Sequence, residues 1–116
     1  MEVVRRALTY AYVQVPDEQA SAWLGVAAAV VREDEGTTLL LPRIDAERAG
    51  LPWQFEAAWL TVRAVTGLAE VGVTARLAAT LAEAGVPANV LAGASHDHVL
   101  VPAADAERAV AVLRAV

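Results

Sequence analysis

His96 and His98 flank Asp97 and are the only histidines in the sequence. In a β-strand, alternate side chains share a face, so the two imidazoles should point together and Asp97 away from them. Such a pair could bind a divalent metal or form a pH-sensitive contact. A zinc site needs three or four ligands, the chain has no Cys, and the neighbouring Asn89 is not a usual zinc ligand. We therefore expect no metal. A ligand contact, a hydrogen bond between units and a structural role remain open for the pair.

Catalysis is not expected from the same segment. Ser95 precedes His96 directly, and adjacent residues of a strand face opposite ways, so the two cannot form a nucleophile–base dyad. The sequence contains no nucleophile elbow, phosphate-binding loop or metal-binding helix motif. The carboxylates gather in Glu33-Asp34-Glu35 and in Asp45 and Glu47, which are typical of a solvated turn and a helix surface. We expect a protein that is not an enzyme and needs no cofactor.

Composition narrows the class of partner. The chain has 116 residues, and its nine basic residues are all Arg, set against fourteen acidic residues for a net charge of −5. A nucleic-acid surface would need clustered positive charge, so nucleic acid is not an expected partner. The longest apolar run, residues 22–31, is about half of a bilayer span, and the first residues lack the apolar stretch of a signal peptide. These features favour a cytoplasmic protein without membrane contact.

An internal repeat organises the chain. Residues 40–49, LLPRIDAERA, match residues 100–109, LVPAADAERA, 60 positions later, with Pro, Asp, Ala, Glu, Arg and Ala coinciding. Gly25-Val26 falls on Gly85-Val86 at the same offset. Matching secondary-structure signals surround both copies, which favours a duplicated unit. We place the units at residues 1–53 and 54–116 of one compact body.

The same elements are predicted in each copy. In the second, hydrophobic periodicity predicts strands over 57–65, 88–92 and 97–101 and helices over 71–84 and 103–114. In the first, strands are expected over 10–15, 26–32 and 37–41, a shortened helical turn over 16–24 and a helix over 44–49. The order is β-α-β-β-α, twice, which predicts an α+β fold of ferredoxin-like units with helices on one face of an antiparallel sheet. The fourth strand that each unit lacks should be shared, with residues 54–65 serving both.

The tandem units and two local motifs give the chain a family likeness. Residues 70–73, EVGV, enter the first helix of the second unit, and residues 89–102, NVLAGASHDHVLVP, span its hairpin. With the βαββα order, these motifs resemble the ACT-domain family, and within it the small stand-alone proteins with two ACT units. The resemblance implies a non-catalytic regulatory or sensor protein that binds a small molecule, with an amino acid or a small organic acid as the expected ligand.

The residues at the expected site also have a physical rationale. A helix N-terminus at Val71-Gly72-Val73 offers unpaired N–H groups to a carboxylate, and Gly72 would allow close approach of a ligand. Asn89 could donate and accept hydrogen bonds, and the strand carrying His96 and His98 could complete the contacts. Alternatively, Gly72 serves only the turn and Asn89 only a strand end.

A competing hypothesis comes from the aromatic side chains. Tyr10, Tyr12 and Trp59 alternate with aliphatic residues, so they should line the open face of the sheet. If exposed, they would form an apolar patch of the kind that binds partners, and the protein would be an interaction or oligomerisation module without a ligand. The same patch predicts a homodimer. The loop at residues 51–55 could instead cover these rings.

Overall fold

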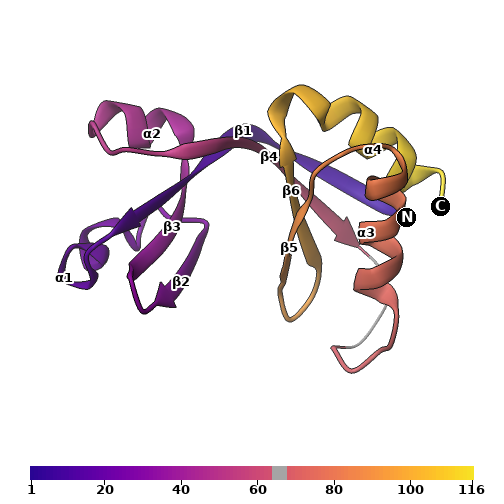
Figure 1. Ribbon diagram of the computed structural model, residues 1–116, viewed down its shortest axis with the longest axis horizontal. Helices are drawn as coiled ribbons and strands as arrows, with labels where there is room; N and C mark the ends of the chain where they lie inside the picture. The colour runs from indigo at the N-terminus through magenta and orange to yellow at the C-terminus, as the bar shows by residue number, and fades with distance from the viewer. Residues whose placement is uncertain (64–67) are drawn as a thin grey trace. The chain divides into compact units, whose positions relative to one another are not determined.

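The computed structural model describes residues 1–63 and 68–116. Its strands form a six-stranded antiparallel sheet in the order β2-β3-β1-β4-β6-β5 (Figure 1). The first half of the chain contains β1 (Glu2–Val15), α1 (Asp17–Ala20), the 3₁₀ turn Ser21–Trp23, β2 (Ala29–Glu33), β3 (Gly36–Pro42) and α2 (Arg43–Arg48). The second half contains β4 (Gln54–Arg63), α3 (Val73–Glu83), β5 (Asn89–Ala92), β6 (Asp97–Pro102), the 3₁₀ turn Ala103–Asp105 and α4 (Ala106–Arg114). The predicted α+β class and the doubled β-α-β-β-α order are confirmed.

The chain forms two compact units that exchange the ends of two strands. The N-terminal unit comprises Leu8–Glu56, and the C-terminal unit comprises Met1–Ala7 together with Ala57–Val116. Both β1 and β4 therefore run through the two units, which supplies the strands that neither repeat contains by itself. The strand expected to start at Tyr10 begins at Glu2. Of the strand predicted over 57–65, residues 64–65 lie outside the described residues.

The core of the C-terminal unit lies between its strands and two helices. Leu77 and Leu81 of α3 are fully buried, as is Leu113 of α4. They pack against alternate strand residues, Ala58, Leu60, Val62, Val99 and Val101, and against Val3 of β1. Burying a leucine side chain stabilises the fold by about 1.5–3 kcal/mol, so this aliphatic layer fixes the helices on one face of the strands.

The first residues of the chain are tied to the same unit. The Met1 ammonium group donates to the carbonyl oxygen of Leu113 at 3.1 Å, and the Arg114 guanidinium donates to the carbonyl oxygen of Val3 at 2.9 Å. A positive charge beside the last carbonyls of a helix is favourable because those groups carry partial negative charge. These contacts hold the start of β1 against α4.

The N-terminal unit has a smaller core of the same design. Val13 and Val15 of β1 pack with Leu39 and Leu41 of β3 and with Ala46 of α2. At the start of β3, Gly36 has φ +146°, and a Cβ there would lie 2.7 Å from the carbonyl oxygen of Val15. Only glycine fits this position, so it fixes the hairpin against β1.

The aromatic residues expected on an exposed face are covered. Tyr10 is 6% exposed and Trp59 is 2% exposed, so the predicted exposed aromatic patch is wrong. The Arg6 guanidinium lies 4.3 Å from the centre of the Trp59 ring, within the range of a cation–π contact. Tyr12 is half-buried. Its ring and that of Phe55 meet edge to face, with their centres 6.0 Å apart. Phe55, at the start of β4, therefore covers part of Tyr12, whereas Arg6 and His98 contact Trp59.

Candidate functional site

The start of α3 has the geometry expected of a helix entry. Gly72 is the N-cap residue with φ 91°, in the left-handed region, and no side chain caps the helix. The first N–H groups of α3 therefore have no side-chain partner at the cap. The structured helix begins at Val73, two residues later than predicted, and the Val71 side chain is 94% exposed.

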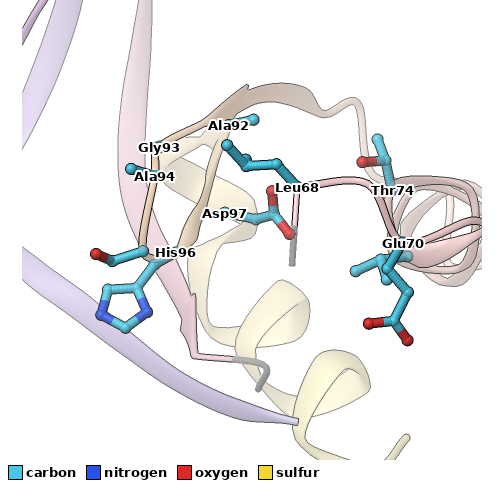
Figure 2. Close-up of a pocket in the computed structure, with 10 residues that line it drawn as sticks. Leu68, Glu70, Thr74, Ala92, Gly93, Ala94, His96 and Asp97 are labelled. Atoms are coloured by element: carbon cyan, nitrogen blue, oxygen red, sulfur yellow. The ribbon is translucent and has the colours of Figure 1, made fainter. Parts of the chain in front are cut away.

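A small cavity of about 70 Å³ adjoins this helix start. One wall is formed by Leu68, Glu70, Val73 and Thr74, and the other by the β5–β6 turn, residues 92–97. The Asp97 carboxylate points into the space between the turn and α3, whereas the His96 imidazole points to the other side of the turn (Figure 2). The cavity thus combines a helix N-terminus with one inward carboxylate.

His98 lies on the sheet face opposite the helices. It pairs with Thr61 across β4 and β6. The next residue along β6, Val99, belongs to the core under the helices, so His98 faces the other way. The Trp59 indole N–H donates to His98 Nδ1 at 3.2 Å, and the Thr61 hydroxyl is 3.0 Å from the same atom. Because the indole N–H donates to Nδ1, this contact fits the neutral tautomer of His98 that carries its proton on Nε2. Burial, reinforced by the charge of Arg6, lowers the pKa of His98 below its usual value.

Gly93 makes room for this imidazole. A Cβ at position 93 would lie 3.0 Å from His98 Nε2 and 3.0 Å from the carbonyl oxygen of His96. The Gly93 N–H also donates to that carbonyl oxygen at 2.9 Å, which closes the hairpin. Within β6, Asp97 and His98 therefore face opposite sides, whereas His96 lies in the turn before the strand.

The predicted site residues divide between the two faces. Val73 and the main chain of His96 line the cavity at α3, with Gly72 and Val71 directly before the helix. Asn89 pairs with Leu100 in the register that also pairs Leu91 with His98, so the Asn89 side chain lies on the open face. Asn89 and His98 therefore do not meet the helix start, and a ligand contact by either of them stays a prediction.

Sequence reasoning missed a larger cavity in the N-terminal unit. It has a volume of about 220 Å³ and is lined by Asp17, Ala20, Ser21, Leu24, Arg32 and Thr37. Arg32 pairs with Thr37 across the β2–β3 hairpin, just as Ala92 pairs with Asp97 across the β5–β6 hairpin. Residues 32 and 37 stand 60 positions before 92 and 97. The two cavities therefore occupy equivalent places in the two repeats, and the repeat offset was the signal that could have located the first.

The charges around this larger cavity have opposite signs. The Thr37 hydroxyl, on a residue that is 2% exposed, donates to Asp17 Oδ1 at 2.8 Å. Across residues 1–63 and 68–116, no carboxylate forms an ion pair with Arg32. The guanidinium presents five donors, and a carboxylate such as that of Asp17 accepts several hydrogen bonds. The cavity thus offers a cation, an anion and hydroxyl groups over an apolar floor.

Two further properties concern only the part of the chain that the structure describes. There, no three His, Asp or Glu side chains gather closely enough to hold a metal ion. Nor does any described helix have the length and apolar character needed to cross a membrane.

Two family models, both of the ACT domain, match the sequence. One matches residues 54–115 and the other residues 1–58. Together they span both repeats, and they meet within β4, the strand that runs through both units. A search among proteins of curated function finds no match.

Solved structures share the fold over nearly the whole chain. A Vibrio cholerae protein of unknown function, described as a possible transport protein, is 34% identical with a TM-score of 0.88, over 97% of this chain and 86% of that one. The regulatory subunit of aspartate kinase from Thermus flavus is 17% identical with a TM-score of 0.73, over 98% and 95%. The aspartokinase alpha and beta subunits are 18% identical with a TM-score of 0.72, over 97% and 95%. At 17–18% identity, the last two likenesses show the fold alone.

Proposed function

Because the chain belongs to the ACT-domain family, we propose that it is a non-catalytic regulatory protein that binds a free amino acid. The family match supports small-molecule binding in general. The choice of an amino acid depends on one observation: Arg32 and Asp17, two side chains of opposite charge, both line the cavity of the N-terminal unit. Those two side chains complement the two charges of a zwitterion.

Each part of an amino acid has a partner in this cavity. Arg32 can donate two parallel hydrogen bonds to the α-carboxylate, an arrangement that gives strength and direction. Asp17 can accept a hydrogen bond from the α-ammonium group. Leu24 and Ala20 supply an apolar surface for the ligand side chain. A cavity of about 220 Å³ is somewhat smaller than the 300–1,000 Å³ typical of drug-sized ligands, which suits a single amino acid.

The cavity at α3 also offers one positive and one negative partner, in a smaller space. The N-terminus of α3 attracts negative charge, and Asp97 lines the opposite wall. A volume of about 70 Å³ corresponds to roughly two waters at about 30 Å³ each, so it can receive only a ligand head group. We propose the predicted contacts of Gly72, Val73 and His96 for this weaker site.

Binding of an amino-acid panel tests the proposal. Purified protein would be titrated calorimetrically with the common amino acids and with small organic acids. A binding amino acid should lose most of its affinity in Arg32→Ala. Arg48→Ala removes an exposed Arg from α2, outside the cavity, and should bind as the wild type does. If no amino acid binds, or if Arg32→Ala binds equally well, the proposed site is wrong.

Association of the chain with itself is the second candidate function. β2 is an edge strand of the sheet, and its Val30 and Val31 are 41% and 43% exposed. An exposed edge strand presents unpaired backbone groups that can pair with another strand. A homodimer formed along β2 accounts for these valines without a ligand, and the binding panel separates the two functions.

A further inference from the structure

A second concave surface lies on the other side of the β2–β3 hairpin. It encloses about 400 Å³ and is lined by Tyr12, Val13, Gln14, Val31, Glu33, Thr38 and Gln54. Side chains alternate along a strand, so Val31 and Glu33 face the opposite side of β2 from Arg32. This surface, termed the open-face groove below, is therefore separated by the sheet from the cavity that Arg32 lines.

One wall of the groove is aromatic. The Tyr12 ring is half-buried, and burial raises the pKa of its phenol. Phe55 supports Tyr12 by an edge contact and has φ 61°, a left-handed conformation that is uncommon for a bulky residue. Phe55 follows Gln54, which lines the groove. Such conformations persist where the surrounding structure holds them, and they cluster at binding surfaces.

The groove continues past this wall. An adjoining depression of about 270 Å³ is lined by Tyr12, Gln14, Pro52, Trp53 and Gln54. Because both hollows share Tyr12, Gln14 and Gln54, these three residues are the boundary that a bound molecule would cross. An elongated ligand could therefore contact both hollows.

The charge of the groove selects the class of ligand. Among residues 1–63 and 68–116, the one carboxylate in its lining is that of Glu33, whose Oε1 accepts a hydrogen bond from the Thr38 hydroxyl. Within the same described residues, no Lys or Arg lines either hollow. The two glutamines add amide oxygens that accept hydrogen bonds, and a tyrosine face attracts cations. A positively charged organic group would find both the Glu33 carboxylate and the amide oxygens here, whereas an anion would be repelled by Glu33.

We propose that the open-face groove binds a small organic cation with two amino groups, a linear diamine. One ammonium group pairs with Glu33, and the other reaches the Tyr12 ring and the amide oxygens of Gln14 and Gln54, the residues that line both hollows. The site goes beyond the amino-acid site and does not depend on it, since the two lie on opposite sides of β2.

Side-chain amide signals give a direct test with 1,4-diaminobutane. The amide side chains of the chain are those of Gln14, Gln19, Gln54 and Asn89. In ¹H–¹⁵N spectra of the full-length protein, the signals of Gln14 and Gln54 should shift saturably, while those of Gln19 and Asn89 stay in place. Absence of any shift at Gln14 and Gln54 up to millimolar diamine would overturn the proposal, as would equal shifts of all four.

A matched pair of variants separates the groove from the general negative charge of the protein. Glu33→Gln should weaken diamine binding on the order of fivefold, the effect of losing one partly exposed ion pair of about 1 kcal/mol. Glu83→Gln makes the same charge change on the exposed surface of α3 and should leave the affinity unchanged. Equal weakening in both variants would mean diffuse attraction and would refute the site. Arg32→Ala should not affect diamine binding, whether or not an amino acid binds on the other side.

Discussion

Replacing Asp17 with Ala should destabilise the protein by about 1 kcal/mol, because the change removes the acceptor of a buried hydroxyl. Thr37 is 2% exposed, and its hydroxyl donates to Asp17 Oδ1 at 2.8 Å. A buried polar group that loses its partner costs about 1–3 kcal/mol. The lower end applies here, since Asp17 is exposed and water can enter the cavity of about 220 Å³ beside Thr37.

Urea denaturation followed by circular dichroism measures this effect. With a slope of about 1–3 kcal/mol per molar urea, the midpoint should fall by about half a molar unit. Asp17→Asn keeps an oxygen acceptor and should be affected less. Thr37→Val removes the hydroxyl that needs a partner, so Asp17→Ala should cost little in a Thr37→Val background, as a double-mutant cycle would measure.

Glu18→Ala is the control, since it removes the next acidic residue of α1, which does not line the cavity. The reasoning is refuted if Asp17→Ala and Glu18→Ala are equally stable, or if Thr37→Val leaves the cost of Asp17→Ala unchanged. In either case the hydrogen bond would not stabilise the fold.

Three further predictions concern pH, the hairpin turn and association. Because burial and the charge of Arg6 lower the pKa of His98, the folded state binds a proton less readily than the unfolded state. The contribution of His98 to the free energy of unfolding should therefore be fully present above about pH 6.5 and be lost as the pH drops toward the lower folded-state pKa. Urea midpoints at pH 7.5 and 5.5 should differ less in His98→Gln than in the wild type. Gly36→Ala should lower the melting temperature strongly, since its Cβ would lie 2.7 Å from the Val15 carbonyl oxygen at φ +146°. In the control Gly25→Ala, the added Cβ meets no atom within 4 Å, so the variant should be tolerated. Equal losses of melting temperature in both would contradict the packing described. Sedimentation velocity at micromolar concentration should show a dimer of this 12.2 kDa chain, and a strict monomer would remove the association candidate.

The doubled fold could be predicted because its signals are local. The repeat at residues 40–49 and 100–109, together with alternating and helical hydrophobic patterns, located nearly every strand and helix to within a few residues. The buried residues of α3 and α4, including Leu77, Leu81 and Leu113, follow from the same periodicity.

The extent of β1 could not be predicted from the same signals. Arg5 and Arg6 interrupt the alternation of apolar residues, because the side chains of this part of the strand are exposed. The contacts that keep it in place are distant in sequence: β1 pairs with β4, Val3 packs in the core of the C-terminal unit, and Met1 and Arg114 form hydrogen bonds with the opposite end of the chain. Pairing over such separations depends on the tertiary fold and leaves no periodic pattern.

The candidate site was only partly predictable for a related reason. Alternation placed Asp97 and His98 on opposite faces of a strand, as they lie in β6, but it does not tell which face the helix α3 covers. The predicted set therefore combined Gly72 and Val73 with Asn89 and His98, which the register places on opposite faces. The cavity at Arg32 and Asp17 joins residues of different elements, and the repeat offset relates it to the second unit only once the register of β2 with β3 is known.

Calorimetric titration with the amino-acid panel, in wild type and in Arg32→Ala, tests the central claim most directly. At least one amino acid should bind the wild type with a stoichiometry of one per chain at the stronger site. Its affinity should fall about tenfold or more in Arg32→Ala, as expected for the loss of a paired, charge-assisted contact of roughly 1.5–3 kcal/mol. Arg48→Ala should bind normally. No heat of binding from any amino acid, or unchanged affinity in Arg32→Ala, would contradict the account.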